Sequence, residues 1–105
     1  SSAASDVYKR QGIKNIEKRI EDIKKEMISN RSLIQTYELA IRKILIEEYA
    51  ASEEDLEGSI DEWRWPEGGR EDEKIQSMEK KIREYMEKNK DLQKKLEDLK
   101  GKVKK

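Results

Sequence analysis

The spacing of apolar residues constrains this chain more than any other feature. Two runs of apolar side chains recur every three or four residues, and each run contains one asparagine. The first run is Ile13, Ile16, Ile20, Ile23, Met27, Asn30, Ile34, Tyr37, Ile41 and Ile44, and the second is Ile75, Met78, Ile82, Tyr85, Asn89, Leu92, Leu96, Leu99 and Val103. Sustained a/d spacing of this kind is typical of coiled-coil helices. It predicts two long helices on either side of the helix-breaking residues Pro66, Gly68 and Gly69.

The two asparagines indicate how these helices pair. In an antiparallel hairpin, the residue numbers of facing positions have a constant sum. Placing Asn30 opposite Asn89 also places a positions against d positions in the other layers, for example Ile44 against Ile75. An asparagine in an apolar seam needs a polar partner and then selects the register. We therefore expect Asn30 and Asn89 to form a polar layer that fixes the register. A parallel homodimer that stacks Asn30 on its own copy is the alternative.

The predicted fold class is all-α, an antiparallel two-helix coiled-coil hairpin with a short third helix at the connecting end. The expected bounds are a helix over 12–51, a short helix over 53–63, a turn over 64–70 and a helix over 71–103. The short helix is expected because Ser52 and the acidic residues after it resemble a helix N-terminus. Leu56, Ile60 and Trp63 then follow at helical spacing.

The connecting end is more apolar than a two-helix seam requires. Leu33, Leu39, Leu45, Ile46 and Tyr49 lie off the a/d positions, so we expect another segment or a partner to cover them. The two tryptophans either pack in this head or anchor a partner protein. The candidate partner surface comprises Leu45, Ile46, Tyr49, Trp63 and Trp65, with the acidic residues Glu53, Glu54, Asp55 and Glu57.

Composition argues against several classes of function. The 24 basic and 24 acidic side chains balance, which disfavours a protein that binds nucleic acid through bulk charge. The chain has no cysteine and no histidine, and we expect no enzyme activity, cofactor or metal. Asp55, Glu57, Ser59 and Asp61 alternate like calcium ligands, but the glycine and closing glutamate of a calcium loop are missing. No apolar run is long enough for a membrane span, so we expect a cytoplasmic protein.

The first eleven residues, SSAASDVYKRQ, differ in character from the rest. They resemble, codon by codon, the in-frame translation of an adapter used to prepare sequencing libraries. This resemblance implies that the gene was read from environmental DNA and that the natural sequence starts at Gly12. We therefore expect residues 1–11 to be a non-native tail, disordered or extending the first helix, and residues 12–105 to form one hairpin domain.

These features favour a non-enzymatic coiled-coil module for protein–protein interaction or oligomerisation, with a homodimer as the expected state. A nucleic-acid-associated helical arm or phage-type regulator is one alternative. The hairpin resembles the transfer-RNA-binding arm of seryl-tRNA synthetases in architecture, and residues 100–105 carry four lysines. A small acidic inhibitor, such as an anti-CRISPR protein, is another, because residues 47–62 carry eight acidic side chains and no basic one.

Overall fold

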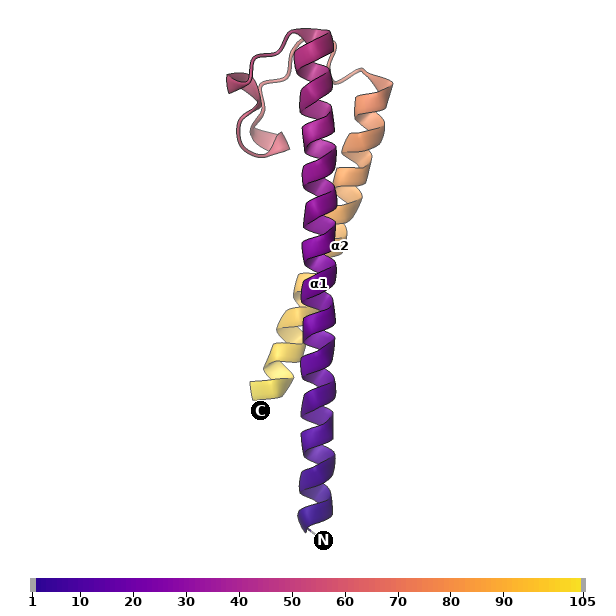
Figure 1. Ribbon diagram of the computed structural model, residues 1–105, viewed down its shortest axis with the longest axis vertical. Coiled ribbons are helices and arrows are strands. Elements are labelled where there is room, and N and C mark those ends of the chain that lie inside the picture. Colours follow the sequence, from indigo (N-terminus) through magenta and orange to yellow (C-terminus); the bar gives the residue numbers. More distant parts are fainter. Residues whose placement is uncertain (1, 105) are drawn as a thin grey trace.

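Two long antiparallel helices make up most of the protein. The computed structural model describes residues 2–104, with side chains for residues 9–103. The elements are α1 (Ser2–Tyr49), the 3-10 turns η1 (Glu54–Leu56) and η2 (Ile60–Glu62), and α2 (Glu73–Lys104). They form a rod of 72 × 21 × 15 Å, with both chain ends at the same end of the rod (Figure 1). The predicted all-α helical hairpin is confirmed. Residues 2–11 belong to α1, and Ser1 and Lys105 lie outside the described residues.

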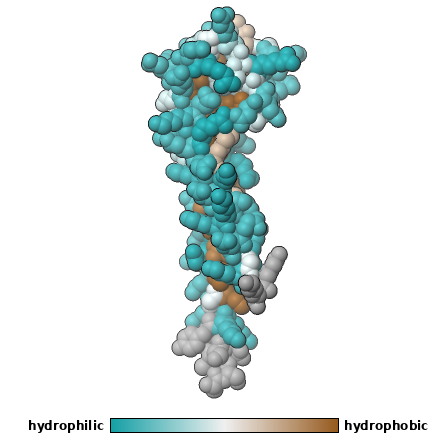
Figure 2. Space-filling model, turned by 180° about the vertical axis from the view of Figure 1, so that it is seen from behind, coloured by the Kyte–Doolittle hydropathy of each residue, from teal (hydrophilic) through white to brown (hydrophobic). Residues whose placement is uncertain are grey.

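The seam between α1 and α2 has two apolar parts. The larger part lies at the connecting end and contains the fully buried side chains of Ile41, Ile75 and Ile82. The smaller part lies toward the chain ends and contains Met27, Leu92 and Leu96. Figure 2 shows the consequence for the surface, where apolar colour forms a narrow strip between hydrophilic side chains. A narrow stripe is what a/d spacing predicts for a two-helix seam.

Helix α1 ends at a residue with a left-handed backbone. Ala50 has a φ of 56°, and the Ala51 amide donates to the Leu45 carbonyl at 3.0 Å. Helices commonly end with one left-handed residue of this kind, a position that glycine normally takes. The chain turns sharply there and returns along the side of α1 (Figure 1). The helix therefore stops at Tyr49 rather than at the predicted residue 51.

The single short helix expected over 53–63 is wrong. The structure has two 3-10 turns there, η1 and η2, separated by Gly58 with a φ of 80°. Left-handed backbone at Gly58 interrupts the helical hydrogen bonds, and the Trp63 indole N–H donates to the Gly58 carbonyl at 3.1 Å. Leu56, Ile60 and Trp63 are nevertheless all buried. Their spacing identified the residues that pack inward but not the backbone that carries them.

Asp72, which the sequence prediction did not single out, lies directly before α2 and caps its first turn. The carboxylate oxygen Oδ1 accepts the backbone amides of Lys74 and Ile75 at 2.9 and 3.2 Å. An aspartate in this position satisfies amides that have no partner in the first turn of a helix. An acidic residue three positions before the first apolar residue of the second run was the available sequence signal.

Candidate interaction surfaces

The two asparagines face each other across the seam. The Asn30 side-chain amide donates to Oδ1 of Asn89 at 2.9 Å, and the Asn89 amide donates to the Met27 carbonyl at 3.1 Å. Asn30 is 7% exposed, so this bond lies largely away from water. The layer separates the two apolar parts of the seam. The facing arrangement is the one that their positions in the two runs predict, and every other register would leave a buried amide without this partner.

The head of the hairpin covers part of the predicted partner surface. Leu45 is fully buried and Trp63 is 6% exposed, so neither is available to a partner. A Cβ atom added at Gly69 would lie 2.7 Å from Cδ2 of Leu45, which shows how closely the connection packs on α1. A side chain at position 69 would therefore force the Leu45 methyl group to move. Leu45 and Trp63 therefore belong to the core of the head, contrary to their place in the predicted surface.

The other apolar members of that surface are half-buried. Ile46, Tyr49 and Trp65 pack against the edge of the head core. The Arg70 guanidinium lies 4.5 Å from the Trp65 ring centroid, a cation–π contact that covers the ring from outside. The Tyr49 hydroxyl donates to Asp72. Trp65 and Tyr49 already have partners within the chain, which weakens the prediction that they anchor another protein.

The acidic members of the predicted surface lie at the outer end of the rod. Glu53, Glu54 and Glu57 are exposed, while Asp55 is half-buried. Asp55 serves the backbone of the connection, because its amide donates to the Ser52 hydroxyl at 3.3 Å and its carbonyl accepts the Arg64 amide at 2.7 Å. Glu53, Glu54 and Glu57 thus remain available to a partner.

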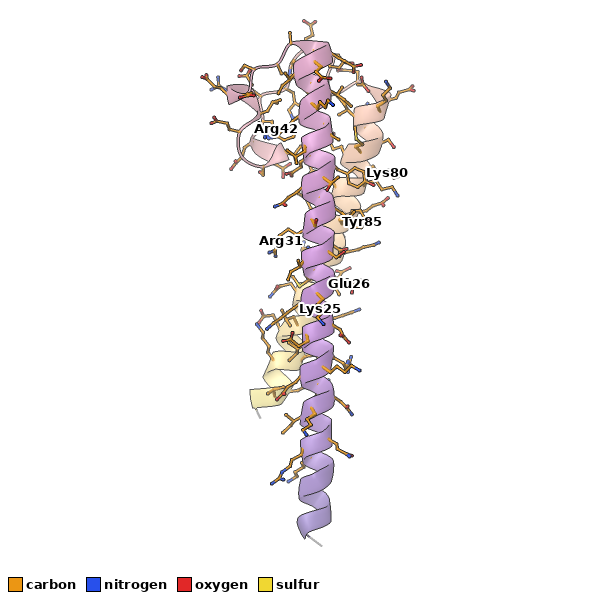
Figure 3. The ribbon with its side chains drawn as sticks, viewed as in Figure 1. Lys25, Glu26, Arg31, Arg42, Lys80 and Tyr85 are labelled. Carbon is orange, nitrogen blue, oxygen red and sulfur yellow. The ribbon has the colours of Figure 1, made fainter. Side chains whose placement is uncertain are left out.

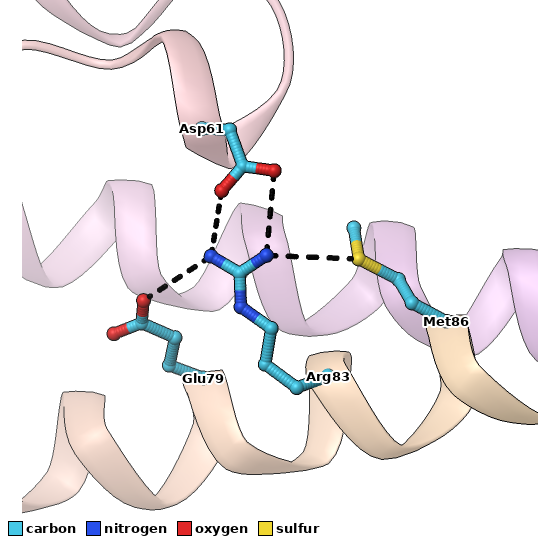
Figure 4. A network of polar contacts seen from close by, with 4 residues as sticks. All are labelled: Asp61, Glu79, Arg83 and Met86. Carbon is cyan, nitrogen blue, oxygen red and sulfur yellow. Dashed lines mark hydrogen bonds and ion pairs between the residues drawn. The ribbon is translucent and has the colours of Figure 1, made fainter.

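An ion pair that sequence reasoning missed ties the connection to α2. The Arg83 guanidinium binds the Asp61 carboxylate in a bidentate manner, with N···O distances of 2.6 and 3.3 Å, and also lies 3.6 Å from Glu79 (Figure 4). The hydrogen bonds and charge of Arg83 lower the pKa of Asp61. Asp61 is therefore committed to a structural contact. No group of three or more acidic side chains in the described residues is placed to hold a metal ion.

The largest uncovered apolar feature is on the side of α1 that faces away from α2. Ile28 and Leu39 are 64% and 62% exposed, and Ile46 is half-buried. Leu39 and Ile46 follow Ile28 by 11 and 18 residues, or about three and five helical turns, so the three side chains form one line. Leu33 is 37% exposed on a different side of α1.

Shallow grooves accompany this line of residues. One groove of about 370 Å³ is lined by Leu39, Arg42, Lys43, Ile46 and Glu47. Another of about 240 Å³ contains Ile28 and connects it to the edge of the seam at Met27 and Leu96. Grooves that carry apolar side chains along an exposed helix are suited to the side chains of a second helix.

Basic side chains flank the apolar line. The residues within about 60° of it between positions 24 and 46, at 100° per residue, are Lys24, Lys25, Ile28, Arg31, Ser32, Gln35, Leu39, Arg42, Lys43 and Ile46. We call this set the outer face of α1. It has five basic residues and no acidic one. Arg31 and Arg42 extend from the same side of the helix (Figure 3), and Nε of Arg42 is buried with no hydrogen-bond partner in the described part of the chain.

Ile28, Leu39 and Ile46 recur at helical spacing in the sequence, but they lie outside the a/d positions of the seam. The sequence prediction noted Leu39 and Ile46 as apolar residues outside the seam and did not relate them to Ile28.

Comparison of the chain with family models, curated proteins and solved structures gives no match. Between residues 2 and 104, no helix combines the length and the apolar character that crossing a membrane requires.

Proposed function

We propose that this protein is a non-enzymatic helical module that binds another protein, and that it self-associates through the outer face of α1. The observation that carries the proposal is the exposure of Ile28 and Leu39 on one line of a helix whose remaining apolar residues are mostly covered. Ile28 and Leu39 are the most exposed large apolar side chains of residues 9–103, at 64% and 62%, followed by Ile13 at 42% and Leu33 at 37%. Burial of exposed apolar surface is the main favourable term in protein association.

The fold supports this role in a second way. A helix of 48 residues presents its outer side chains at fixed positions over the length of the rod. A rigid helix loses little conformational entropy on binding, which favours association. The outer face carries basic side chains and the head carries exposed acidic ones, and a partner of complementary charge would bind either region faster and with greater specificity.

The mass of the full chain in solution tests the proposal. We expect light scattering over a range of concentrations to give the mass of a dimer at high concentration. Leu39→Asp places a charge at the centre of the outer face and should give the monomer mass. Ser77→Asp adds the same charge at an exposed position of α2 and should leave the mass unchanged. A monomer at every concentration, or equal effects of both variants, would contradict the proposal.

The basic residues of the outer face support nucleic-acid binding as a second candidate function. Lysine and arginine side chains along one helix face can contact phosphates, and such binding weakens steeply with salt. Arg31→Glu should then abolish retention of an RNA duplex at low salt, while Lys80→Glu on α2 should not. If the wild-type chain shows no salt-dependent retention, this candidate is excluded.

A further inference from the structure

The outer face of α1 also indicates what kind of partner it binds, an inference that rests on the proposed function. We propose that it binds an amphipathic helix of another protein whose apolar stripe has acidic side chains along both edges. Such a helix competes with the second copy of the chain for the same face. The partner is therefore defined by its chemistry, as an acidic helix long enough to cover Ile28, Leu39 and Ile46.

The apolar line sets the length of this partner. At 1.5 Å per residue, Ile28 and Ile46 are about 27 Å apart along α1, with Leu39 between them. A partner helix needs about 18 residues, or about five turns, to cover all three side chains. One groove lies beside Leu39 and Ile46, and another lies beside Ile28. They give the apolar side chains of a helix two separate places to pack.

Basic side chains lie on both sides of the apolar line. On a helical projection at 100° per residue, Lys24, Arg31 and Arg42 lie about 40–60° to one side. Lys25 and Lys43 lie about 60° to the other side. A helix that packs on the line thus meets positive charge along both edges of its apolar stripe. Acidic side chains at both edges complement this pattern.

These charges have no anionic partner within the described part of the chain. The ion pairs of residues 9–103 all involve Lys81 or Arg83 on α2. Arg42 lines the larger groove, and its Nε is buried without a hydrogen-bond partner among those residues. Glu47 lines the same groove but lies about 100° from the apolar line, outside the outer face. Carboxylates of a partner would therefore supply the negative charge that the outer face lacks.

Two other occupants fit this face less well. A second copy that binds through its own outer face brings five more basic side chains, and like charges oppose association. A nucleic acid matches the charge, but its phosphate backbone offers no apolar surface to cover Ile28 and Leu39. An acidic helix complements both the charge and the apolar line. Self-association is therefore expected only at high concentration, where an acidic helix should displace the second copy.

A synthetic peptide tests the inference with the full chain. The probe is a helical peptide of about 21 residues, with leucines at i, i+4, i+7 and i+11 spacing, glutamates along both edges of that stripe and alanine elsewhere. The matched control peptide has lysine in place of every glutamate. Fluorescence anisotropy should show that the glutamate peptide binds about tenfold more tightly at low salt, and that added salt reduces the difference. Equal affinities, or tighter binding of the lysine peptide, would overturn the inference.

Charge reversal locates the binding on the outer face. Arg31→Glu combined with Lys43→Glu changes one charge on each side of the apolar line and should raise the dissociation constant of the glutamate peptide about tenfold. The same double variant should bind the lysine peptide more tightly than the wild type does. Lys80→Glu combined with Lys90→Glu makes the same change in charge at exposed positions of α2 and should leave both constants unchanged. Equal losses in the two double variants would overturn the inference.

Light scattering separates this inference from self-association. The glutamate peptide should convert the dimer into one chain with one peptide, and a peptide bound to an intact dimer would place it away from the outer face. A chain that dimerises without binding the peptide overturns only the inference. A monomeric chain that binds the peptide overturns only self-association, and a chain that does neither overturns both. An RNA duplex that displaces the peptide, and that loses affinity with Arg31→Glu, would assign the face to phosphates and overturn the inference.

Discussion

The Tyr49 hydroxyl donates a hydrogen bond of 2.7 Å to Oδ2 of Asp72. The other carboxylate oxygen of Asp72 accepts two backbone amides at the start of α2. One carboxylate therefore both begins α2 and connects it to the last residue of α1. These hydrogen bonds, with that from Tyr49 the largest contribution, lower the pKa of Asp72, and the same contact raises the pKa of Tyr49.

The lowered pKa of Asp72 predicts how stability changes in acid. Because the folded-state pKa is below the unfolded one, Asp72 stabilises the fold above the usual carboxyl range of about pH 4. This contribution is lost as the pH falls through the folded-state pKa. We expect Asp72→Ala to lower the thermal unfolding midpoint at about pH 7 and to approach the wild type at about pH 3. Asp98→Ala removes a carboxylate from the exposed surface of α2 and is the control. A deficit of equal size at both pH values would contradict the prediction.

The asparagine layer predicts strong coupling between its two members. Asn30→Leu and Asn89→Leu each leave one amide without its partner in the seam and should each reduce the free energy of unfolding by about 1–3 kcal/mol. The double variant removes both polar groups and should regain most of this loss. Chemical denaturation of the four proteins measures the coupling. Additive losses in the double variant would show that the two amides do not act as a pair.

Much of the fold follows from the apolar period and its two interruptions. The a/d spacing identifies which side of each helix is buried, and Asn30 opposite Asn89 sets the alignment. Both features depend only on which residues share one face of a helix, so they can be recognised from residue spacing in the sequence. The burial of Leu56, Ile60 and Trp63 follows from their spacing in the same way.

The connection is less predictable because its contacts depend on backbone that leaves the helical path. Gly58 is left-handed in the structure, yet a glycine within a helical pattern only lowers the preference for helix. The partner of Asp61 is Arg83, 22 residues away on α2, and no sequence period relates them. For the same reason the sequence suggested Trp63 and Leu45 as a surface, although the returning chain buries both.

The left-handed residue at the end of α1 predicts a stabilising substitution. Ala50 occupies a conformation that costs an L-residue about 1–2 kcal/mol, whereas glycine adopts it without a steric penalty. After the entropy cost of glycine, Ala50→Gly should raise the free energy of unfolding by about 0.5–1 kcal/mol. Ala40→Gly within α1 is the matched control and should lower it by a similar amount. If both variants lose stability, the left-handed backbone at Ala50 does not form in solution.

Glu38 predicts a pH dependence of the opposite sign to that of Asp72. Burial beside the connection raises the pKa of Glu38, the charge of Asp61 raises it further, and a hydrogen bond from the Ile60 amide opposes both. Because the folded-state pKa is above the unfolded one, the stability gained from protonation is present in acid and lost as the pH rises through the folded-state pKa. At about pH 7 the ionised carboxylate therefore opposes docking of the connection on α1.

Glu38→Gln tests this directly, because the amide keeps an acceptor for Ile60 without the charge. We expect the variant to unfold at a higher temperature than the wild type at about pH 7, and the difference to shrink as the pH falls toward about 4. Glu21→Gln, at an exposed position of α1, controls for the general effect of removing one negative charge. A Glu38→Gln variant that is less stable than the wild type at about pH 7 would show that the carboxylate stabilises the head. The hydrogen bond from Ile60 would then outweigh burial and the repulsion from Asp61.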